Sequence, residues 1–282
     1  GVVLVTTKSG RKEKTRVTYQ GTVGFSSPIN MPQMMNSLEF ARYVNERNDN
    51  DGVKHKISDD LIKKMEGFMA NPYSAEFPGI NANQNGTDWA SSMDAVYANT
   101  DWFDYYFKDA AIRHSHNLNV TGGSDKFNYY VGLGYTYQEG LLDQVDDNLS
   151  KYNVNTKLQL QATSWLKFNF NNNITLNILK RPMANQTIFY GKLGQTIPNA
   201  PTHYPIDSQY NDASEYRFLK ESHYVQNRIS YAMSFAATIT PLEGWDIVGE
   251  MKVRLDVEDN SFKRGYPTVE RPNGQLNIAK NT

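Results

Sequence analysis

Apolar and polar residues alternate along most of this chain, so that side chains of one character recur at every second position. Successive side chains of a β-strand point to opposite faces, and a period of two therefore predicts strands with one apolar and one polar face. In residues 127–138 the apolar side is Phe127, Tyr129, Val131, Leu133, Tyr135 and Tyr137. The same pattern predicts six further strands, at residues 16–25, 112–121, 152–162, 166–178, 228–240 and 245–257.

The predicted strands are long, and the connections between them alternate between short and long. Several strands reach about 11 residues, the length that a tilted strand needs to cross a bilayer. Membrane barrels have short turns at one end and long loops at the other. The sequence therefore predicts an all-β fold, a partial antiparallel transmembrane β-barrel of about seven strands. Its short turns lie near 122–126, 163–165 and 241–244, and its long connections are 26–111, 139–151 and 179–227.

Composition narrows the classes of function. The formal net charge of -1 gives no reason to expect nucleic acid as a partner. The chain has no Cys, which excludes disulfides and thiolate metal sites. It contains no run of about 18 apolar residues, so no transmembrane helix is predicted, whereas barrel strands need apolar residues at alternate positions only. No nucleophile elbow, P-loop, dinucleotide fingerprint or zinc-protease motif occurs, and we expect no enzyme and no cofactor.

The connection 26–111 carries two helix signals. Asn36 followed by Glu39 at the third helical position is a capping box, and an apolar set follows it. Ser58 can cap a second helix, with Asp59 and Asp60 in its first turn. Residues 70–100 are rich in Asn, Gly, Pro and Ser, and are expected to form an ordered surface loop.

Several stretches of the chain resemble the SusC/RagA family of TonB-linked outer-membrane transporters. Residues 1–10, GVVLVTTKSG, resemble the end of that family's plug domain, and residues 99–104, NTDWFD, resemble a stretch early in its barrel. Further matching stretches are HNLNVTGGS at 116–124, YYVGLGY at 129–135, QEGLL at 138–142, SWLK at 164–167 and PNAP at 198–201. Their order and spacing cover residues 1–210, while 211–282 follows in strand pattern only.

The resemblance implies two parts, the C-terminal end of a plug domain at 1–10 and the N-terminal portion of the barrel at 11–282. It implies a large plugged barrel in the outer membrane of a Gram-negative cell, in contact with lipid and capped by a SusD-like surface lipoprotein. The TonB complex would act through an N-terminal part that is not in this chain. Since plugged transporters have about 22 strands, we expect the chain to be a portion of a longer protein. The connections 26–111, 139–151 and 179–227 and the tail 259–282 would lie outside the cell.

Candidate site residues are few. Trp89, Trp102, Tyr105 and Tyr106 could stack on a sugar, although packing of the first connection or contact with the lid lipoprotein is an equal interpretation. Four other groups of residues could also be functional sites, but each has a simpler structural explanation, and no metal site is predicted. His114 and His116 could bind a metal together but lack a third ligand, and Asp49–Gly52 fails the calcium-loop pattern. The acidic residues Asp143, Asp146 and Asp147 suit a solvated turn. Gly132 and Gly134 leave room for a plug.

The leading hypothesis for function is import of nutrient oligomers, either glycan or peptide, by the SusC-like half of a two-protein complex. A soluble β-rich surface lectin or adhesin is the alternative, in which the apolar faces would pack into a sandwich core. A passive porin is the second alternative, against which the plug-like segment at 2–7 argues.

Overall fold

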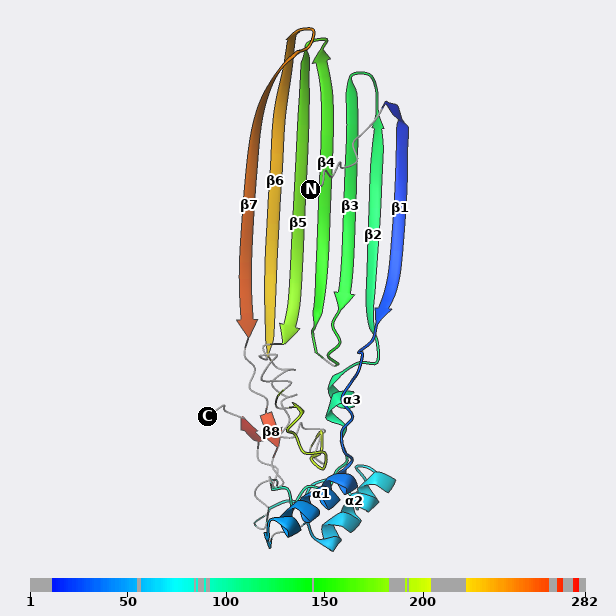
Figure 1. Ribbon diagram of the computed structural model, residues 1–282, viewed down its shortest axis with the longest axis vertical. Helices are drawn as coiled ribbons and strands as arrows, with labels where there is room; N and C mark the ends of the chain where they lie inside the picture. Colours follow the sequence, from blue (N-terminus) through cyan, green and yellow to red (C-terminus); the bar gives the residue numbers. More distant parts are fainter. Residues whose placement is uncertain are drawn as a thin grey trace.

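The computed structural model describes residues 12–54, 57–83, 85, 89, 92–143, 145–182, 191, 193–203, 222–263, 268–270 and 276–278. Seven long strands form one antiparallel sheet in which each strand pairs with the next one along the chain (Figure 1). This confirms the predicted strand number and the antiparallel order. The strands are β1 Glu13–Ser26, β2 Ala111–Gly123, β3 Phe127–Glu139, β4 Asn148–Thr163, β5 Leu166–Pro182, β6 His223–Leu242 and β7 Trp245–Lys263.

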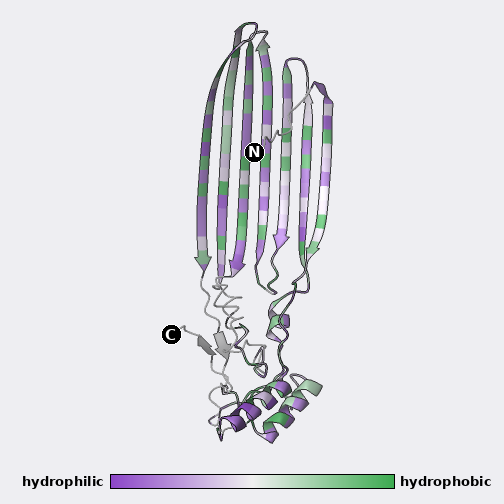
Figure 2. Cartoon of the chain, viewed as in Figure 1, coloured by the Kyte–Doolittle hydropathy of each residue, from purple (hydrophilic) through white to green (hydrophobic). Residues whose placement is uncertain are grey.

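The pairing register brings side chains of one character onto one face across the whole sheet. Residues directly opposite each other in an antiparallel pair project from the same face. One such row is Tyr129, Leu158, Phe170, Phe235 and Met251. The neighbouring row on the opposite face is Tyr130, Lys157, Asn171, Ser234 and Lys252. We call these surfaces the apolar face and the polar face, and their alternation is visible along each strand (Figure 2).

Short and long connections are segregated to opposite ends of the sheet. Residues 124–126, 164–165 and 243–244 make the three turns, and we call this the turn end. Gly244 supports the last turn with φ +82°, a backbone conformation that glycine adopts without a steric penalty. Connections 27–110, 140–147 and 183–222 leave from the other end, the loop end, where the helices lie (Figure 1).

Most strands extend further toward the loop end than the alternation predicts. β4 begins at Asn148, β5 ends at Pro182 and β6 begins at His223, so the second and third connections are shorter than predicted. The reason is visible on the apolar face, where Asn148 and Lys180 stand in register at this end. Polar residues there occupy both faces, so the alternation stops while the backbone pairing continues.

The two predicted helices form with the predicted caps. In α1, Ser37–Asn50, Asn36 Oδ1 accepts from Glu39 N and Glu39 Oε2 accepts from Asn36 N, each at 2.9 Å. In α2, Asp59–Ala70, Ser58 Oγ accepts from Leu61 N at 3.2 Å. Their apolar sides pack together with the segment 96–98. The buried members of this core are Ala41, Val44, Ile57, Leu61, Met65, Phe68, Tyr97 and Ala98.

One helix and part of the core were not predicted. α3, Trp102–Tyr106, begins after Asp101, whose carboxylate accepts from the backbone N–H groups of Phe103 and Asp104. Residues 96–98, expected on the surface, are buried. A two-stranded ribbon, β8 Thr268–Glu270 with β9 Leu276–Ile278, follows the sheet. Within the described ranges, no helix has the length and apolar character that a membrane span requires.

Candidate functional site

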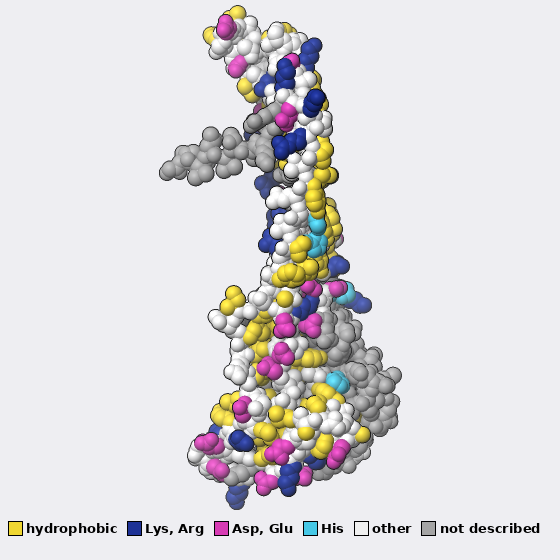
Figure 3. All heavy atoms as spheres, turned by 90° about the vertical axis from the view of Figure 1, so that its right-hand side faces the viewer, with side chains coloured by type: hydrophobic (Ala, Val, Ile, Leu, Met, Phe, Trp, Pro, Cys, Tyr) yellow, Lys and Arg dark blue, Asp and Glu magenta, His cyan; other side chains and the backbone are white. Residues whose placement is uncertain are grey.

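The apolar face of the sheet is uncovered. On β1 alone, Val17 and Phe25 expose 63% and 75% of their surface. On β7, at the opposite edge, Trp245, Ile247, Met251 and Leu255 are exposed as well. Seen from the β1 side, hydrophobic side chains gather along one margin of the narrow sheet (Figure 3). A contiguous apolar surface of this extent indicates contact with lipid or with another protein.

The height of this apolar surface matches a bilayer. It runs from the row of Leu166, Ile239 and Ile247 at the turn end to the row that contains Leu176 and Val257. From Leu166 to Leu176 the strand rises roughly 33 Å at about 3.3 Å per residue. With the tilt of about 40° found in membrane barrels, this corresponds to a band about 25 Å tall.

On β1 to β4, aromatic and histidine side chains lie at the limit of the apolar band that is nearest the loop end. The Tyr19 hydroxyl and His116 Nδ1 are 2.6 Å apart, and His116 Nε2 lies 3.2 Å from His114 Nδ1. Tyr137 stacks on His114, and Tyr135 stacks on His116. Tyrosine at this level is typical of the interfacial girdle of a barrel. No third histidine or carboxylate joins the pair, and the described residues contain no group of three such side chains that could hold a metal ion.

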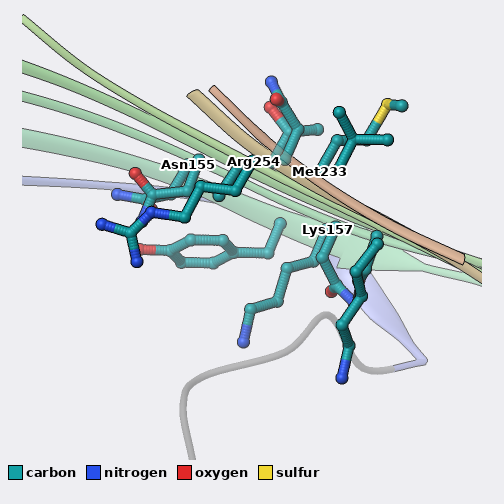
Figure 4. Close-up of a pocket in the computed structure, with 13 residues that line it drawn as sticks. Asn155, Lys157, Met233 and Arg254 are labelled. Carbon is teal, nitrogen blue, oxygen red and sulfur yellow. Dashed lines mark hydrogen bonds between the residues drawn. The ribbon is translucent and has the colours of Figure 1, made fainter. Parts of the chain in front are cut away.

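The polar face contains a hollow of about 910 Å³ at mid-height. Ala232 and Ser234 line it with small side chains, while Tyr130, Lys157 and Arg254 project beside them. Figure 4 shows Asn155, Lys157 and Arg254 on the polar side of the sheet, whereas Met233 points to the other side. Arg254 Nε donates to Asp256 Oδ2 at 2.8 Å, and the Asn171 amide donates to Ser234 Oγ at 3.1 Å.

At the loop end, the first and third long connections are joined by hydrogen bonds. Trp102 is fully buried, and its Nε1 donates to the carbonyl of Ile197 at 2.9 Å. Thr100 N donates to the carbonyl of Pro198 at 2.8 Å, and Thr100 Oγ1 donates to that of Ala200 at 2.9 Å. The sequence stretches NTDWFD and PNAP therefore interlock, although about 95 residues separate them. We call residues 96–106 together with 197–201 the clasp.

Asn199 is the centre of the clasp. Its side chain has no solvent exposure, and its amide donates to the carbonyls of Met93 and Val96 at 3.1 and 2.9 Å. Its own carbonyl accepts from Ala98 N at 2.9 Å. Backbone carbonyls shielded from water need a partner, and the Asn199 side chain supplies one to the buried carbonyl of Val96 and to the partly buried carbonyl of Met93. Sequence reasoning noted PNAP as a family resemblance and missed this role, because the partners lie on another connection.

The four aromatic candidates have different surroundings. Trp102 and Tyr106 are buried, and their rings stack at 5.9 Å in a core that also contains Leu193 and Ala200. Tyr105 is partly buried and meets Trp102 edge to face at 5.7 Å. Trp89 packs, partly buried, against the pair Ile80 and Val96. The structure thus brings three of the four together and places Trp102 and Tyr106 as packing residues.

The acidic connection between β3 and β4 is partly folded onto this core. Asp143 N donates to the carbonyl of Tyr106 at 2.8 Å, whereas Asp146 is exposed. Burial raises the pKa of the Asp147 carboxyl, although the Leu142 N–H and the charges of Lys108 and Arg181 act in the opposite direction. The turn is packed, and the described residues contain no group of three histidine or carboxylate side chains that could hold a metal ion.

Known proteins with a similar sequence are TonB-dependent receptors. The chain is 25% identical over 285 residues to TonB-dependent receptor P26 of Formosa agariphila, which covers 97% of the chain and 24% of that protein. It is also 25% identical over 219 residues to TonB-dependent receptor SusC of Bacteroides thetaiotaomicron, covering 77% of the chain and 17% of SusC. No family model matches the chain. The chain thus spans about a quarter or less of these relatives.

The similarity in fold agrees with the similarity in sequence. Among solved structures, the RagAB peptide importer in its closed-closed state superposes with a TM-score of 0.62 at 19% identity, over 92% of this chain and 30% of that one. In both sequence and fold, the chain is similar to the TonB-dependent receptors of the SusC/RagA family. Its seven strands are part of the wall of an outer-membrane β-barrel.

Proposed function

We propose that the protein carrying this chain imports nutrient oligomers across the outer membrane with energy supplied through TonB. The proposal is supported above all by the division of the sheet into a lipid-facing apolar band and an inner face of amides, hydroxyls and cations. Such a wall separates a membrane from an aqueous passage. The relatives are named as receptors and an importer, and none is named as an enzyme.

Two parts of this proposal concern residues beyond the described sheet. Residues 1–10 are proposed to end a plug domain, with 11–282 forming the first portion of the barrel, and 1–10 lie outside the described residues. The TonB contact is proposed to lie in a segment of the longer protein.

A SusD-like surface lipoprotein is the proposed partner at the loop end. The clasp joins the first and third connections there into one folded unit, which is a firm surface for a lid. Deleting residues 70–110 would also remove the buried Tyr97 and Trp102, so substitution of exposed residues is the sharper test of lid contact. Tyr43 on α1, which is half exposed, is one suitable position.

The alternatives make different demands on the sheet. A soluble lectin or adhesin would bury the apolar faces in a sandwich core, whereas the seven strands form one sheet whose apolar face is open. A passive porin shares the wall but needs no energy. The relatives leave the substrate open, since one is named SusC and another a peptide importer.

Uptake by cells tests the proposal. A strain that expresses the full-length protein and its neighbouring lipoprotein should accumulate labelled oligomers, and removal of TonB or collapse of the proton gradient should abolish accumulation. Uptake that persists without TonB would favour the porin. A full-length protein that remains in the aqueous fraction without detergent would contradict the membrane wall itself.

A further inference from the structure

Two aromatic side chains lie next to each other on the polar face, at the loop end of β6 and β7. Tyr224 and Phe262 stand in register, and directly opposite residues of an antiparallel pair have Cβ atoms about 5 Å apart. Within the described strands β4 to β7, they are the only rings on this face, where most other positions hold amides, hydroxyls or charged groups. The pair is therefore a local departure from the polar pattern.

The ring of Phe262 is open, with 72% of the residue exposed to solvent. Two leucines, Leu149 and Leu179, stand in register on the same face, one row nearer the turn end. Leu179 is the diagonal neighbour of Tyr224, because Tyr224 pairs with Arg181 two residues further along β5. Diagonal neighbours lie about 7–8 Å apart, within reach of an aromatic side chain. The open ring is thus one end of an apolar patch that crosses β4 to β7.

A network of polar contacts fixes Tyr224 beside the open ring. Its hydroxyl donates to Asn260 Oδ1 at 2.9 Å, and the guanidinium carbon of Arg181 lies 4.7 Å from the ring centroid. Glu258 Oε1 in turn accepts from the side-chain amides of Asn260 and Gln226, at 2.9 and 2.7 Å. Side chains that are already held lose less conformational freedom when a ligand binds. The aromatic pair and its amides are therefore prepared for a ligand in advance.

The pair lies beyond the apolar band. Val257 belongs to the last row of that band, and Phe262 follows it by five residues, roughly 17 Å at about 3.3 Å per residue. The proposed function places the polar face inside the barrel and the loop end outside the cell. A solute that enters from the loop end would meet this part of the wall before it reaches the hollow at mid-height.

The chemistry of the patch suits a sugar ring. A pyranose presents C–H groups on its broad face, and these lie favourably against the negative face of an aromatic ring such as that of Phe262. Its hydroxyls both donate and accept hydrogen bonds, as amide side chains do. Asn260 is two residues from Phe262 on the same face of β7, and Gln226 stands in register with Asn260. An open ring and two amides thus lie within the dimensions of one sugar unit and its neighbour.

The patch offers less to a peptide. Peptides are commonly recognised by addition of a strand to a free sheet edge or by pockets for their side chains. The backbone of β6 already pairs with β5 on one side and with β7 on the other, so the surface at Tyr224 offers side chains only. An open ring flanked by amides supplies neither an edge nor a pocket.

We propose that Phe262 and Tyr224, with the amides of Gln226 and Asn260, form a subsite for one neutral pyranose unit of an oligosaccharide. The inference rests on the proposed import function and adds a subsite and its class of ligand. The sugar stacks on Phe262, the amides exchange hydrogen bonds with its hydroxyls, and Tyr224 continues the apolar floor toward Leu179. The subsite captures the oligomer at the loop end, before transit.

Binding to the purified full-length protein in detergent tests the subsite. The probes are labelled cellohexaose, labelled maltohexaose and a labelled neutral hexapeptide of alternating leucine and serine. Phe262→Leu keeps an apolar side chain and removes the ring, whereas Phe262→Tyr keeps the ring. Phe25→Leu is the matched control, because Phe25 is 75% exposed and lies near the loop end on the apolar face of β1. Normal heat-modifiable migration on gels verifies that each barrel has folded.

The wild-type protein should bind at least one hexasaccharide more tightly than the hexapeptide. Phe262→Leu should weaken that binding about tenfold, while Phe262→Tyr and Phe25→Leu should stay within twofold of the wild type. Saturation-transfer NMR adds a direct readout of stacking. Saturation of the aromatic protons should reach the ring protons of the bound sugar in the wild type and in Phe262→Tyr, and should fall in Phe262→Leu.

Other outcomes overturn the subsite. Sugar binding that is unchanged in Phe262→Leu removes it, and so does a wild-type protein that binds neither hexasaccharide. Tighter binding of the hexapeptide, with a loss in Phe262→Leu, would make the patch a peptide site. An equal loss of all three probes in Phe262→Leu would mean that the ring packs against another segment of the longer protein.

Uptake by energised cells separates this inference from the proposed function. If an oligomer accumulates in a TonB-dependent manner and Phe262→Leu takes it up as the wild type does, import stands and the subsite fails. If a hexasaccharide binds through Phe262 and no probe accumulates with TonB, the subsite stands and the proposed import fails.

Discussion

The side-chain amide of Asn199 donates to the backbone carbonyl of Val96 over 2.9 Å, across two connections that are about a hundred residues apart in sequence. The same amide donates to Met93; the bond to Val96 is buried and the bond to Met93 is partly buried. Asn199→Ala should therefore destabilise the clasp by about 2 kcal/mol, the cost of two lost hydrogen bonds with one buried acceptor left behind. Hydrogen exchange at the amides of Ala98 and Thr100 measures this as a loss of protection. Asn50→Ala, at an exposed helix end, is the control, and equal protection in both variants would show that the clasp does not depend on Asn199.

The fully buried Trp102 should matter for stability rather than for ligand affinity. Trp102→Ala should cost about 3–5 kcal/mol of local stability, and Trp102→Phe, which loses the bond to Ile197 and some volume, should cost less. Trp165→Phe, in an exposed turn, is the matched control. Chemical unfolding of the loop-end unit measures the stabilities of these three variants and so gives their order. A Trp102→Phe protein with wild-type stability but weakened oligomer binding would instead support the stacking role.

Asn172 is an amide within the apolar band, in register with Thr156 and Met233. Its Oδ1 is buried and has no hydrogen-bond partner, an arrangement that costs roughly 1–3 kcal/mol. Asn172→Leu should raise the stability of the full-length barrel in lipid by an amount in that range. Asn171→Leu, one residue away on the polar face, should give no such gain, because it would replace an amide that donates to Ser234. Urea titration in bilayers compares the stabilities of the Asn172→Leu and Asn171→Leu proteins. An equal change in stability would mean that the two faces of the sheet do not differ in their contact with lipid.

Acidification should loosen the contact between Tyr73 and His203, whose rings stack at 3.9 Å. Burial lowers the pKa of His203, so the folded state favours the neutral ring. The unfolded ring binds its proton first as pH falls below about 6.5, and the stabilisation is lost from there down to the lower pKa of the folded state. Proton NMR of the ring should give a pKa below that of an exposed histidine. Stability measured at pH 7.5 and 5.5 should fall more in the wild type than in His203→Gln, and identical pH dependence would exclude this residue as the cause.

The strands and capped helices could be predicted because their signals are local. The alternation in 127–138 and the Asn36–Glu39 capping box each depend on residues a few positions apart, and both form as predicted. The strand ends could not be placed, because polar residues such as Asn148 and Lys180 occupy both faces where the sheet leaves the band.

The loop-end site was less predictable because it depends on contacts between distant segments. The stretch Asn99–Asp104 shows no hydrophobic periodicity. The five-residue helix α3 that begins within it is held by Asp101 and by the burial of Trp102 against the 197–201 segment. Nothing local to PNAP indicates that Asn199 satisfies carbonyls on another connection. By contrast, the cations of the polar face were readable from the alternation, since residues such as Lys151 and Lys157 stand opposite the apolar positions of β4.

The strands extend beyond the apolar band at the loop end. From Leu176 to Pro182, β5 rises roughly a further 20 Å at about 3.3 Å per residue. The helices and the clasp therefore stand beyond the apolar band, on paired strands. Under the proposed function, a surface lipoprotein anchored in the membrane must extend past the apolar band by a similar distance to contact the clasp.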